Sequence, residues 1–200
     1  VVAESQPRSS PKKKGAAAAS PVTAAPKQID CGVDIDTKEM KKLLQGLRAY
    51  GDTARVDEMI ELTGLVLDTD TVKQATDGLL EECRKAIEEQ PNNKKVMVLD
   101  QDVSINATQL VQRVDDLISL SEDISKFSDE LAFRPVALVK PWQQFKNWSF
   151  PVDDAHLLVG VKRHGFGQWE KIKNDESLSI GPKIALTGGA GTAVPGVSTN

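Results

Sequence analysis

The sequence is poor in the residues that mark exported or metal-binding proteins. Only two of its 200 residues are cysteine, Cys31 and Cys83, and only two are histidine. So few cysteines exclude a disulfide framework and indicate a reduced cytosolic or nuclear setting. His156 and His164 have no cysteine or carboxylate partner at metal-ligand spacing, so neither a metal site nor any other cofactor is predicted.

Long apolar runs are also missing. No stretch approaches the roughly 18 consecutive apolar residues that a transmembrane helix needs, so no contact with a membrane is expected. The apolar start, VVA, is far too short for the core of a secretory signal, so no export is expected. Aromatic residues make up only 4% of the chain, which makes its three tryptophans conspicuous.

The charge is slightly acidic and unevenly placed. Residues 1–27 hold five basic residues and one acidic residue, whereas residues 28–200 hold 20 basic and 28 acidic residues. Because phosphate backbones attract clustered lysine and arginine, any nucleic-acid binding by the folded part must be local. The basic run PKKK, residues 11–14, is either a nuclear-import or DNA-contacting patch or a solvated charge run.

Both ends of the chain have compositions that disfavour folding. Residues 1–32 mix proline, alanine, serine and lysine without an apolar period, and they include Cys31. Such a segment cannot bury enough surface to offset its ordering entropy, so a flexible linker is predicted. Residues 187–200 are predicted to be a glycine-rich flexible loop or tail.

Residues 33–92 show the spacing of three helices. In the first, apolar residues recur at steps of three and four from Asp36 to a stop at Gly51. A short second helix starts at Thr53 or Ala54 and reaches Leu62. The third begins at a cap, Asp70 or Thr71, and continues to Ile87.

Residues 93–146 are predicted to be a connector. The apolar run VMVL, residues 96–99, favours an extended segment laid against the helices. Asn106 and Gln109 resemble a capping box at the start of a linking helix. The rest is proline-interrupted, with one helical turn predicted between Ile124 and Leu131.

Residues 147–186 are predicted to form two further helices. One begins near Ser149 and ends at a left-handed Gly165; the other follows Gly167. A buried tryptophan removes about 150–250 Å² from water. We therefore expect two tryptophans to face each other across a small core, with two aliphatic residues between them: Trp148, Trp169, Leu158 and Val161. The alternative is that the tryptophans stack on bases.

Three stretches carry a family resemblance. WSFPVDDAHLLVGVKRHGFGQWEKIKNDESLSI is similar to a Myb-like repeat and resembles the start of a SLIDE domain. TKEMKKLLQGLRAYGDTARVDEMI resembles a SANT unit, and INATQLVQRVDDLISL resembles the helix that joins the two. Their order is that of the DNA-binding region of Chd-type chromatin remodellers, with the ISWI-type region as the nearest competitor.

This resemblance implies a mainly α fold in which a SANT-like and a SLIDE-like (Myb-type) unit are joined by helical and extended connectors. The spacing of the two tryptophans is about one residue longer than the family pattern. The third helix of the SLIDE repeat does not appear before Asn200. An exposed apolar face is therefore expected in residues 147–186, unless other residues cover it.

The resemblance also implies a function. It is the binding of duplex linker DNA of the nucleosome through the phosphate backbone, with little sequence specificity, in support of nucleosome sliding and spacing in the nucleus. The partners implied are DNA, the nucleosome and the rest of the remodeller chain, which holds an ATPase motor outside this segment. The alternative is a protein-interaction module that binds histone tails, which the acidic balance of residues 28–200 would suit.

The candidate DNA-contacting residues are lysines and arginines in the two helical units, because these side chains neutralise phosphates. Any one of them can equally be a solvated surface charge. They are Lys162, Arg163, Lys171, Lys173 and Lys183 in the C-terminal unit, and Lys41, Lys42 and Arg48 in the first helix. GFG and GGAGTAVPG lack the remaining features of nucleotide-binding loops, and no catalytic constellation is found.

Overall fold

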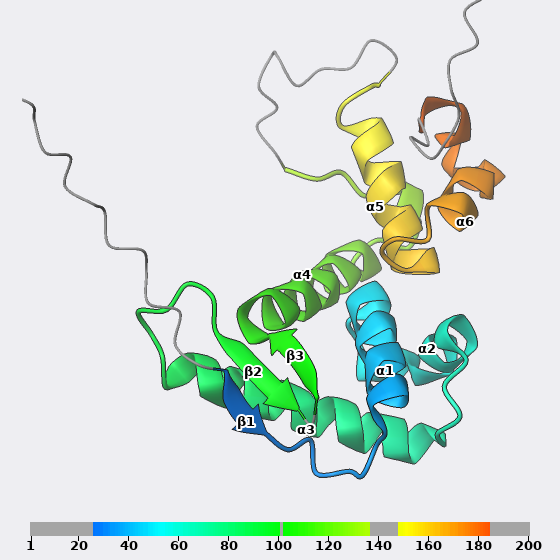
Figure 1. Cartoon of the computed structure of the whole chain (residues 1–200). Helices are drawn as coiled ribbons and strands as arrows, with labels where there is room; N and C mark the ends of the chain where they lie inside the picture. The colour runs from blue at the N-terminus through cyan, green and yellow to red at the C-terminus, as the bar shows by residue number, and fades with distance from the viewer. Residues whose placement is uncertain (1–25, 101, 137–147, 185–200) are drawn as a thin grey trace, which may run out of the picture.

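Six α-helices and a small sheet make up the part of the chain that the computed structural model describes, residues 26–100, 102–136 and 148–184 (Figure 1). The fold is mainly α, as predicted. The helices are α1 (Thr37–Tyr50), α2 (Val56–Thr63), α3 (Thr69–Glu88), α4 (Ala107–Ser125), α5 (Val152–His164) and α6 (Trp169–Asn174). The strands are β1 (Lys27–Ile29), β2 (Met97–Asp100) and β3 (Val103–Asn106). The predicted tail, residues 187–200, and residues 1–25 of the predicted linker lie outside the described residues.

Local capping chemistry sets the ends of α1 as predicted. The carboxylate of Asp36 accepts hydrogen bonds from the backbone N–H groups of Lys38 and Glu39, each at 2.8 Å. Gly51 ends the helix with a φ of 71°, and its N–H donates to the Leu47 carbonyl at 2.8 Å. A Cβ at Gly51 would lie 2.8 Å from the Cβ of Leu117, so this stop also allows α1 to approach α4 closely.

Two predicted helix starts are corrected. The cap of α3 is Asp68, whose carboxylate accepts from both the N–H and the hydroxyl of Thr71. Asp70 and Thr71, the predicted caps, therefore lie inside the first turn. The start predicted for the second helix is a 3₁₀ turn, Thr53–Arg55, and the α-helix begins only at Val56.

The sheet extends into the segment predicted to be a linker. β1 pairs in parallel with β2, and β2 pairs antiparallel with β3. The extended segment predicted at residues 96–99 is confirmed as β2, whereas β1 and β3 were not predicted. Cys31, expected in the linker, is only 2% exposed. The linker prediction is thus wrong for residues 27–32, because pairing with β2 supplies the hydrogen bonds that their composition does not suggest.

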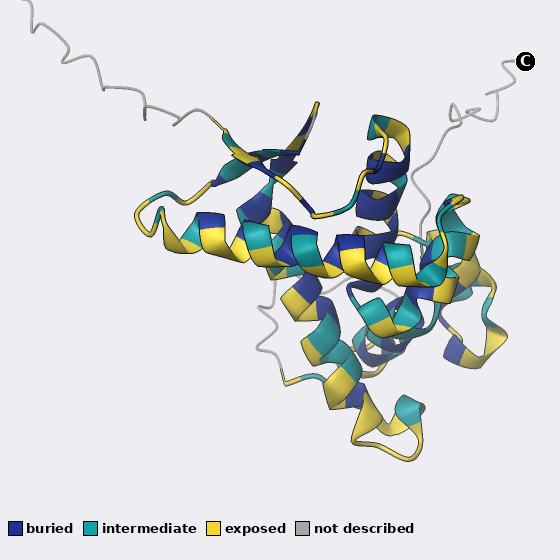
Figure 2. Cartoon of the chain, turned by 90° about the horizontal axis from the view of Figure 1, so that it is seen from below, coloured by how far each residue is buried: buried dark blue, intermediate teal, exposed yellow. Residues whose placement is uncertain are grey.

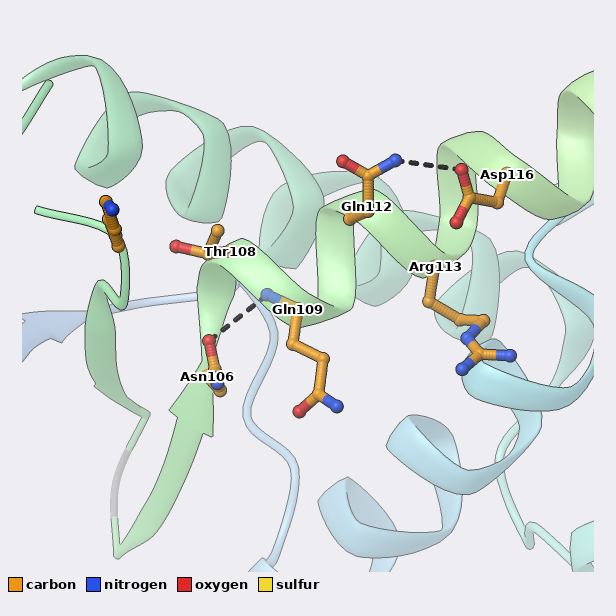
Figure 3. A pocket seen from close by; sticks show the side chains of 7 residues that line it. Asn106, Thr108, Gln109, Gln112, Arg113 and Asp116 are labelled. Carbon is orange, nitrogen blue, oxygen red and sulfur yellow. Dashed lines mark hydrogen bonds between the residues drawn. The ribbon is translucent and has the colours of Figure 1, made fainter. Parts of the chain in front are cut away.

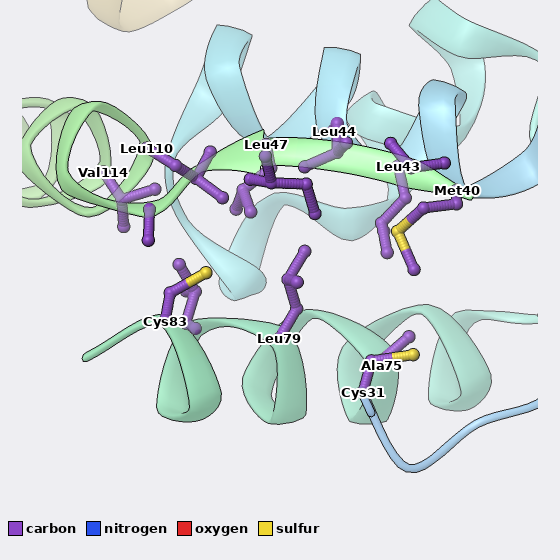
Figure 4. Close-up of a cluster of buried hydrophobic side chains, with 14 of the residues drawn as sticks. Cys31, Met40, Leu43, Leu44, Leu47, Ala75, Leu79, Cys83, Leu110 and Val114 are labelled. Carbon is purple, nitrogen blue, oxygen red and sulfur yellow. The ribbon is translucent and has the colours of Figure 1, made fainter. Parts of the chain in front are cut away.

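The larger core lies between α1, α3, the sheet and the first half of α4. Figure 4 shows Ala75, Leu79 and Cys83 of α3 pointing toward residues of α1 and α4. In the view from below, α3 lies in front and turns its exposed side outward (Figure 2). Since β2, β3 and α4 contribute to this core, residues 93–125 are not simply a connector, and the predicted boundary at residue 92 is corrected.

A second, smaller core joins the end of α4 to the C-terminal helices. Its buried members are Leu117, Ile124, Phe133, Ala155, Val159, Val161, Ile172, Leu178 and Ile180. α4 therefore belongs to both cores and lies between the two groups of helices (Figure 1). α4 and the turn before Phe133 pack against α5 and cover part of the apolar face expected for residues 147–186. The rest is exposed as expected, since Phe150, Val152, Phe166 and Trp169 are each 37% exposed.

The prediction that two tryptophans clamp this core is wrong. Trp169 is 37% exposed and packs edge-on against Phe166, with ring centroids 5.2 Å apart. Trp148 is partly buried and donates from its indole nitrogen to Asp154 at 3.2 Å. Among the described residues, the two indoles form no ring pair with each other. Val161 is buried as predicted, while Leu158 is only partly buried at the edge of the core.

Candidate nucleic-acid interface

Three predicted DNA-contacting cations of the C-terminal unit are held by carboxylates. Lys162 and Arg163, at the end of α5, both pair with Glu130, at 2.7 and 2.8 Å. Arg163 also lies 3.5 Å from the carboxylate of Asp175. Lys183 pairs at 2.7 Å with Asp153, whose side chain is only 5% exposed. These ion pairs join neighbouring segments of the fold, so the three cations are not freely available to phosphates.

The predicted cations of α1 behave differently from one another. Lys42 pairs with Glu39 at 2.7 Å and donates to the Gly64 carbonyl. Lys41 and Arg48 are exposed and form no hydrogen bond or ion pair with the residues that the structure describes. The same holds for Lys171 and Lys173 of α6, of which Lys171 is exposed and Lys173 partly buried. Four of the eight predicted cations therefore remain available.

Arg48 forms part of a groove that sequence reasoning missed. One hollow at the α1–α4 boundary is lined by Arg48, Asn106, Gln109, Leu110, Arg113 and Phe166. A second hollow shares Asn106, Gln109 and Arg113 with the first (Figure 3). It is also lined by Thr108, Gln112 and Asp116 of α4 and by Lys94, which precedes β2. We call the combined lining the arginine groove. It presents three cations and one carboxylate, although the folded part of the chain is acidic overall.

Arg113 and Phe166 bring the C-terminal unit into this groove. The guanidinium of Arg113 lies 3.9 Å from the centre of the Phe166 ring, a cation–π arrangement that leaves its N–H groups able to bind other acceptors. Phe166 is 37% exposed. The side-chain amide of Gln112 donates a hydrogen bond to the carboxylate of Asp116 at 2.8 Å.

Contacts around Tyr50 hold the two units together beside the groove. The N–H of Phe166 donates to the Ala49 carbonyl at 2.7 Å. Arg55 stacks over the Tyr50 ring at 4.5 Å and donates to the carbonyls of Lys162 and Arg163 at the end of α5. Gly165 ends α5 with a positive φ of 92°, as predicted, although its ψ is extended and not that of a left-handed helix, and a Cβ there would lie 2.9 Å from the Tyr50 ring. The relative placement of Arg48, Arg113 and Phe166 is thereby fixed.

The histidines take part in local pairing. His164 lies 2.9 Å from Asp175, and His156 lies 2.6 Å from the Leu178 carbonyl. Although burial opposes it, hydrogen bonds from Ser177 and His164 lower the pKa of Asp175 to about 2. Within the described ranges no group of three or more His, Cys, Asp or Glu side chains could hold a metal ion. Nor does any helix there have the length and apolarity to cross a bilayer.

A sequence signal for the groove existed in α4. Gln109, Gln112, Arg113 and Asp116 follow the helical spacing of three and four that places residues on one face, opposite the buried Leu110 and Val114. This face holds only one cation, so it does not stand out as a cluster of basic residues in the sequence. The other cations of the groove come from residues 48 and 94, and only the fold brings them together.

The described part of the chain is mainly helical, carries a basic groove and ends in the short helix pair α5 and α6. This combination is typical of helix–turn–helix and Myb-like DNA-binding regions. Residues 122–196 match the family described as the ATP-dependent helicase CHD1-2/hrp3 HTH domain. The chain is also similar to Protein CHROMATIN REMODELING 5 of Arabidopsis thaliana, with 41% identity over 113 residues, or 54% of this chain and 6% of that protein.

Chromodomain-helicase-DNA-binding protein 1 of Homo sapiens and of Gallus gallus are each 31% identical over 83 residues, which cover 41% of this chain and 5% of those proteins. The resemblance to the DNA-binding region of a Chd-type remodeller is thus confirmed. The chain spans only a small fraction of the length of these relatives.

Proposed function

We propose that this chain is a DNA-binding accessory region of a chromatin remodeller and that the arginine groove contacts the phosphate backbone of a duplex. The observation that supports this most directly is the convergence of Arg48, Lys94 and Arg113 on one hollow at the junction of the two units. Arginine and lysine neutralise phosphates, and the side-chain amides of Asn106 and Gln109 can donate to phosphate oxygens. The family match supplies independent support, because it covers α5 and α6 next to this groove.

The proposed binding has little sequence specificity. Phosphate contacts fix the position of a protein on a duplex but carry no sequence information. Lys41, Lys171 and Lys173 extend the set of available cations beyond the groove and add non-specific attraction. An acidic chain with few free cations should therefore bind weakly, and its salt dependence should be modest because it scales with the number of phosphates contacted.

The biological role that fits this binding is contact with linker DNA outside the nucleosome core, in support of nucleosome sliding and spacing. The ATPase motor of the parent protein would then lie outside this segment, and the segment itself would be non-catalytic and act in the nucleus. The names of the relatives, a chromatin remodelling protein and helicase-DNA-binding proteins, support this role.

A titration of the chain with a duplex at several salt concentrations tests the proposal. We expect the logarithm of the binding constant to fall linearly with the logarithm of salt, with a slope of about −0.9 for each phosphate contacted. Three groove cations thus give a slope of about −2.7. Fluorescence anisotropy with a labelled duplex of mixed sequence measures it. Affinity that does not change with salt would contradict phosphate binding, and a large preference between unrelated duplexes would contradict the low specificity.

Glu130 should limit how many cations reach DNA. Because its carboxylate holds both Lys162 and Arg163, Glu130→Gln frees Lys162 for phosphates and removes the closer of the two carboxylates that pair with Arg163, which still lies 3.5 Å from Asp175. We expect the salt slope to steepen by up to about 1.8 and the affinity for duplex DNA to rise at low salt. Glu122→Gln, which removes an exposed charge that forms no ion pair with the described residues, is the matched control. Equal gains in both variants would show that only net charge matters.

A further inference from the structure

An acidic hollow lies at the opposite end of the N-terminal unit from the C-terminal helices. Gln28, Ile29, Asp30, Gly32, Val33, Asp34 and Asp100 line a space of ≈ 550 Å³, which is within the usual size range of ligand sites. Three of its seven lining residues are aspartates and none is basic. It therefore has the opposite charge to the arginine groove and would repel a phosphate backbone.

One of the three aspartates lacks part of its hydrogen bonding. Asp100 is 3% exposed, and although its carboxylate interacts with Cys31, its Oδ2 atom has no partner among the described residues. Burial raises the pKa of this carboxyl group. A buried oxygen without a donor costs roughly 1–3 kcal/mol, so a donor that reached it from the hollow would recover a penalty already present in the fold.

The hollow also runs along an unpaired strand edge. β1 lies at one end of the strand order and pairs only with β2 among the described strands, with Ile29 opposite Asp100. Gln28 and Ile29 of β1 lead directly into the loop that carries Asp30 and Asp34. An open strand edge presents backbone N–H and C=O groups to which an extended peptide can pair.

We propose that this hollow binds an extended basic peptide, whose backbone pairs with the free edge of β1 and whose lysine or arginine side chain enters between Asp30, Asp34 and Asp100. The inserted cation is neutralised by the two aspartates at the rim and approaches the buried carboxylate of Asp100 at the floor of the hollow. Asp34 is exposed and forms no ion pair with the residues described. Asp30 accepts from the Gly32 N–H at 2.8 Å through one oxygen, which leaves the other available.

The ligand chemistry follows from these groups. A metal ion fits poorly, because the described residues contain no cluster of three or more side chains with metal-holding geometry. A basic peptide needs no such geometry, since an ammonium or guanidinium group accommodates carboxylates at varied angles. The binding of basic peptides is a function separate from the proposed DNA contact, and it uses a different surface.

The test is a fluorescence anisotropy titration of the whole chain with labelled acetyl-Ala-Lys-Ala-Lys-Ala-Lys-Ala-amide. Asp30→Asn/Asp34→Asn removes both rim charges, while the asparagine at position 30 can still accept from Gly32. We expect this variant to bind the peptide about tenfold more weakly. Glu61→Gln/Asp70→Asn, which removes two exposed charges from α2 and the start of α3, should bind like the wild type. A peptide with proline in place of its two inner alanines, acetyl-Ala-Lys-Pro-Lys-Pro-Lys-Ala-amide, should bind more weakly because it loses two backbone donors.

Two outcomes would overturn the proposal. One is equal peptide affinity of the two double variants. The other is a map of amide chemical shift changes that leaves residues 28–34 unaffected when peptide is added. The affinity for duplex DNA is measured on the same two variants and should be alike in both. Failure of the peptide proposal would therefore not count against the DNA proposal, which the salt titration tests.

Discussion

Replacing Ile172 with alanine is expected to destabilise the protein by about 2–5 kcal/mol, the usual cost of truncating a large buried aliphatic side chain. Ile172 of α6 is fully buried in the smaller core. A Cβ built on Gly160 of α5 would lie 2.8 Å from the Cγ2 of Ile172, so α5 and α6 are in close contact at this point. The cavity left by alanine could not close without moving α5. Urea unfolding followed by circular dichroism measures the loss.

Trp169→Ala is the matched comparison, because it removes a larger side chain from the same helix. Since the indole is 37% exposed and contacts mainly Phe166, we expect a loss of no more than about 1–2 kcal/mol. Amide hydrogen exchange in α5 and α6 locates the effect, which matters because two cores need not unfold in one step. A larger loss for Trp169→Ala than for Ile172→Ala would restore the tryptophan as the anchor of this core.

The contrast between these residues shows why the tryptophan prediction failed. Size and rarity made Trp148 and Trp169 the obvious anchors of a small core. That reasoning assumed that residues 147–186 must build a core alone. In the structure, Leu117 and Ile124 of α4 supply part of it from outside that range, so the indoles are not required inside.

Local signals predicted the helices well. The apolar spacing of α1 and α4 and the side-chain caps Asp36 and Asn106 act within a few residues, so the sequence displays them directly. The sheet depends on distant pairing: β1 is a three-residue strand, KQI, whose partner β2 lies about 70 residues further along. Nothing in KQI itself distinguishes a strand from a linker, because its stability comes from β2 and from the burial of Ile29.

The candidate site shows the same limit. Cation density in the C-terminal unit suggested Lys162 and Arg163, yet Glu130, more than 30 residues earlier, neutralises both. Arg113 was overlooked because it stands alone in its helix. The fold places Arg113 beside Arg48 and against the ring of Phe166. Residues that form no basic cluster in the sequence thus come together in one groove.

The largest effect on function is expected from Arg48→Ala/Arg113→Ala. If each arginine neutralises one phosphate, losing both flattens the salt slope by about 1.8, and at about 0.1 M salt the affinity for a duplex falls by ~60-fold. The chain should remain folded, because Arg48 is exposed and Arg113 packs on only one face of the Phe166 ring. Anisotropy titrations with a labelled duplex at four or more salt concentrations measure both the affinity and the slope.

Two further variants distinguish the effect of the groove on duplex affinity from the effect of the total charge of the chain. Lys73→Ala/Lys85→Ala removes two exposed cations from α3, outside the groove, and should change duplex affinity only slightly, because a distant charge is screened beyond about 10 Å. Arg48→Lys/Arg113→Lys keeps the charges but weakens the stacking on Phe166, and should retain most of the salt slope. If the α3 variant lost as much affinity as the groove variant, the duplex would be responding to net charge and not to this surface. If the lysine variant lost the slope as well, the groove would recognise the guanidinium shape and not its charge, and the expectation of weak sequence preference would have to be abandoned with it.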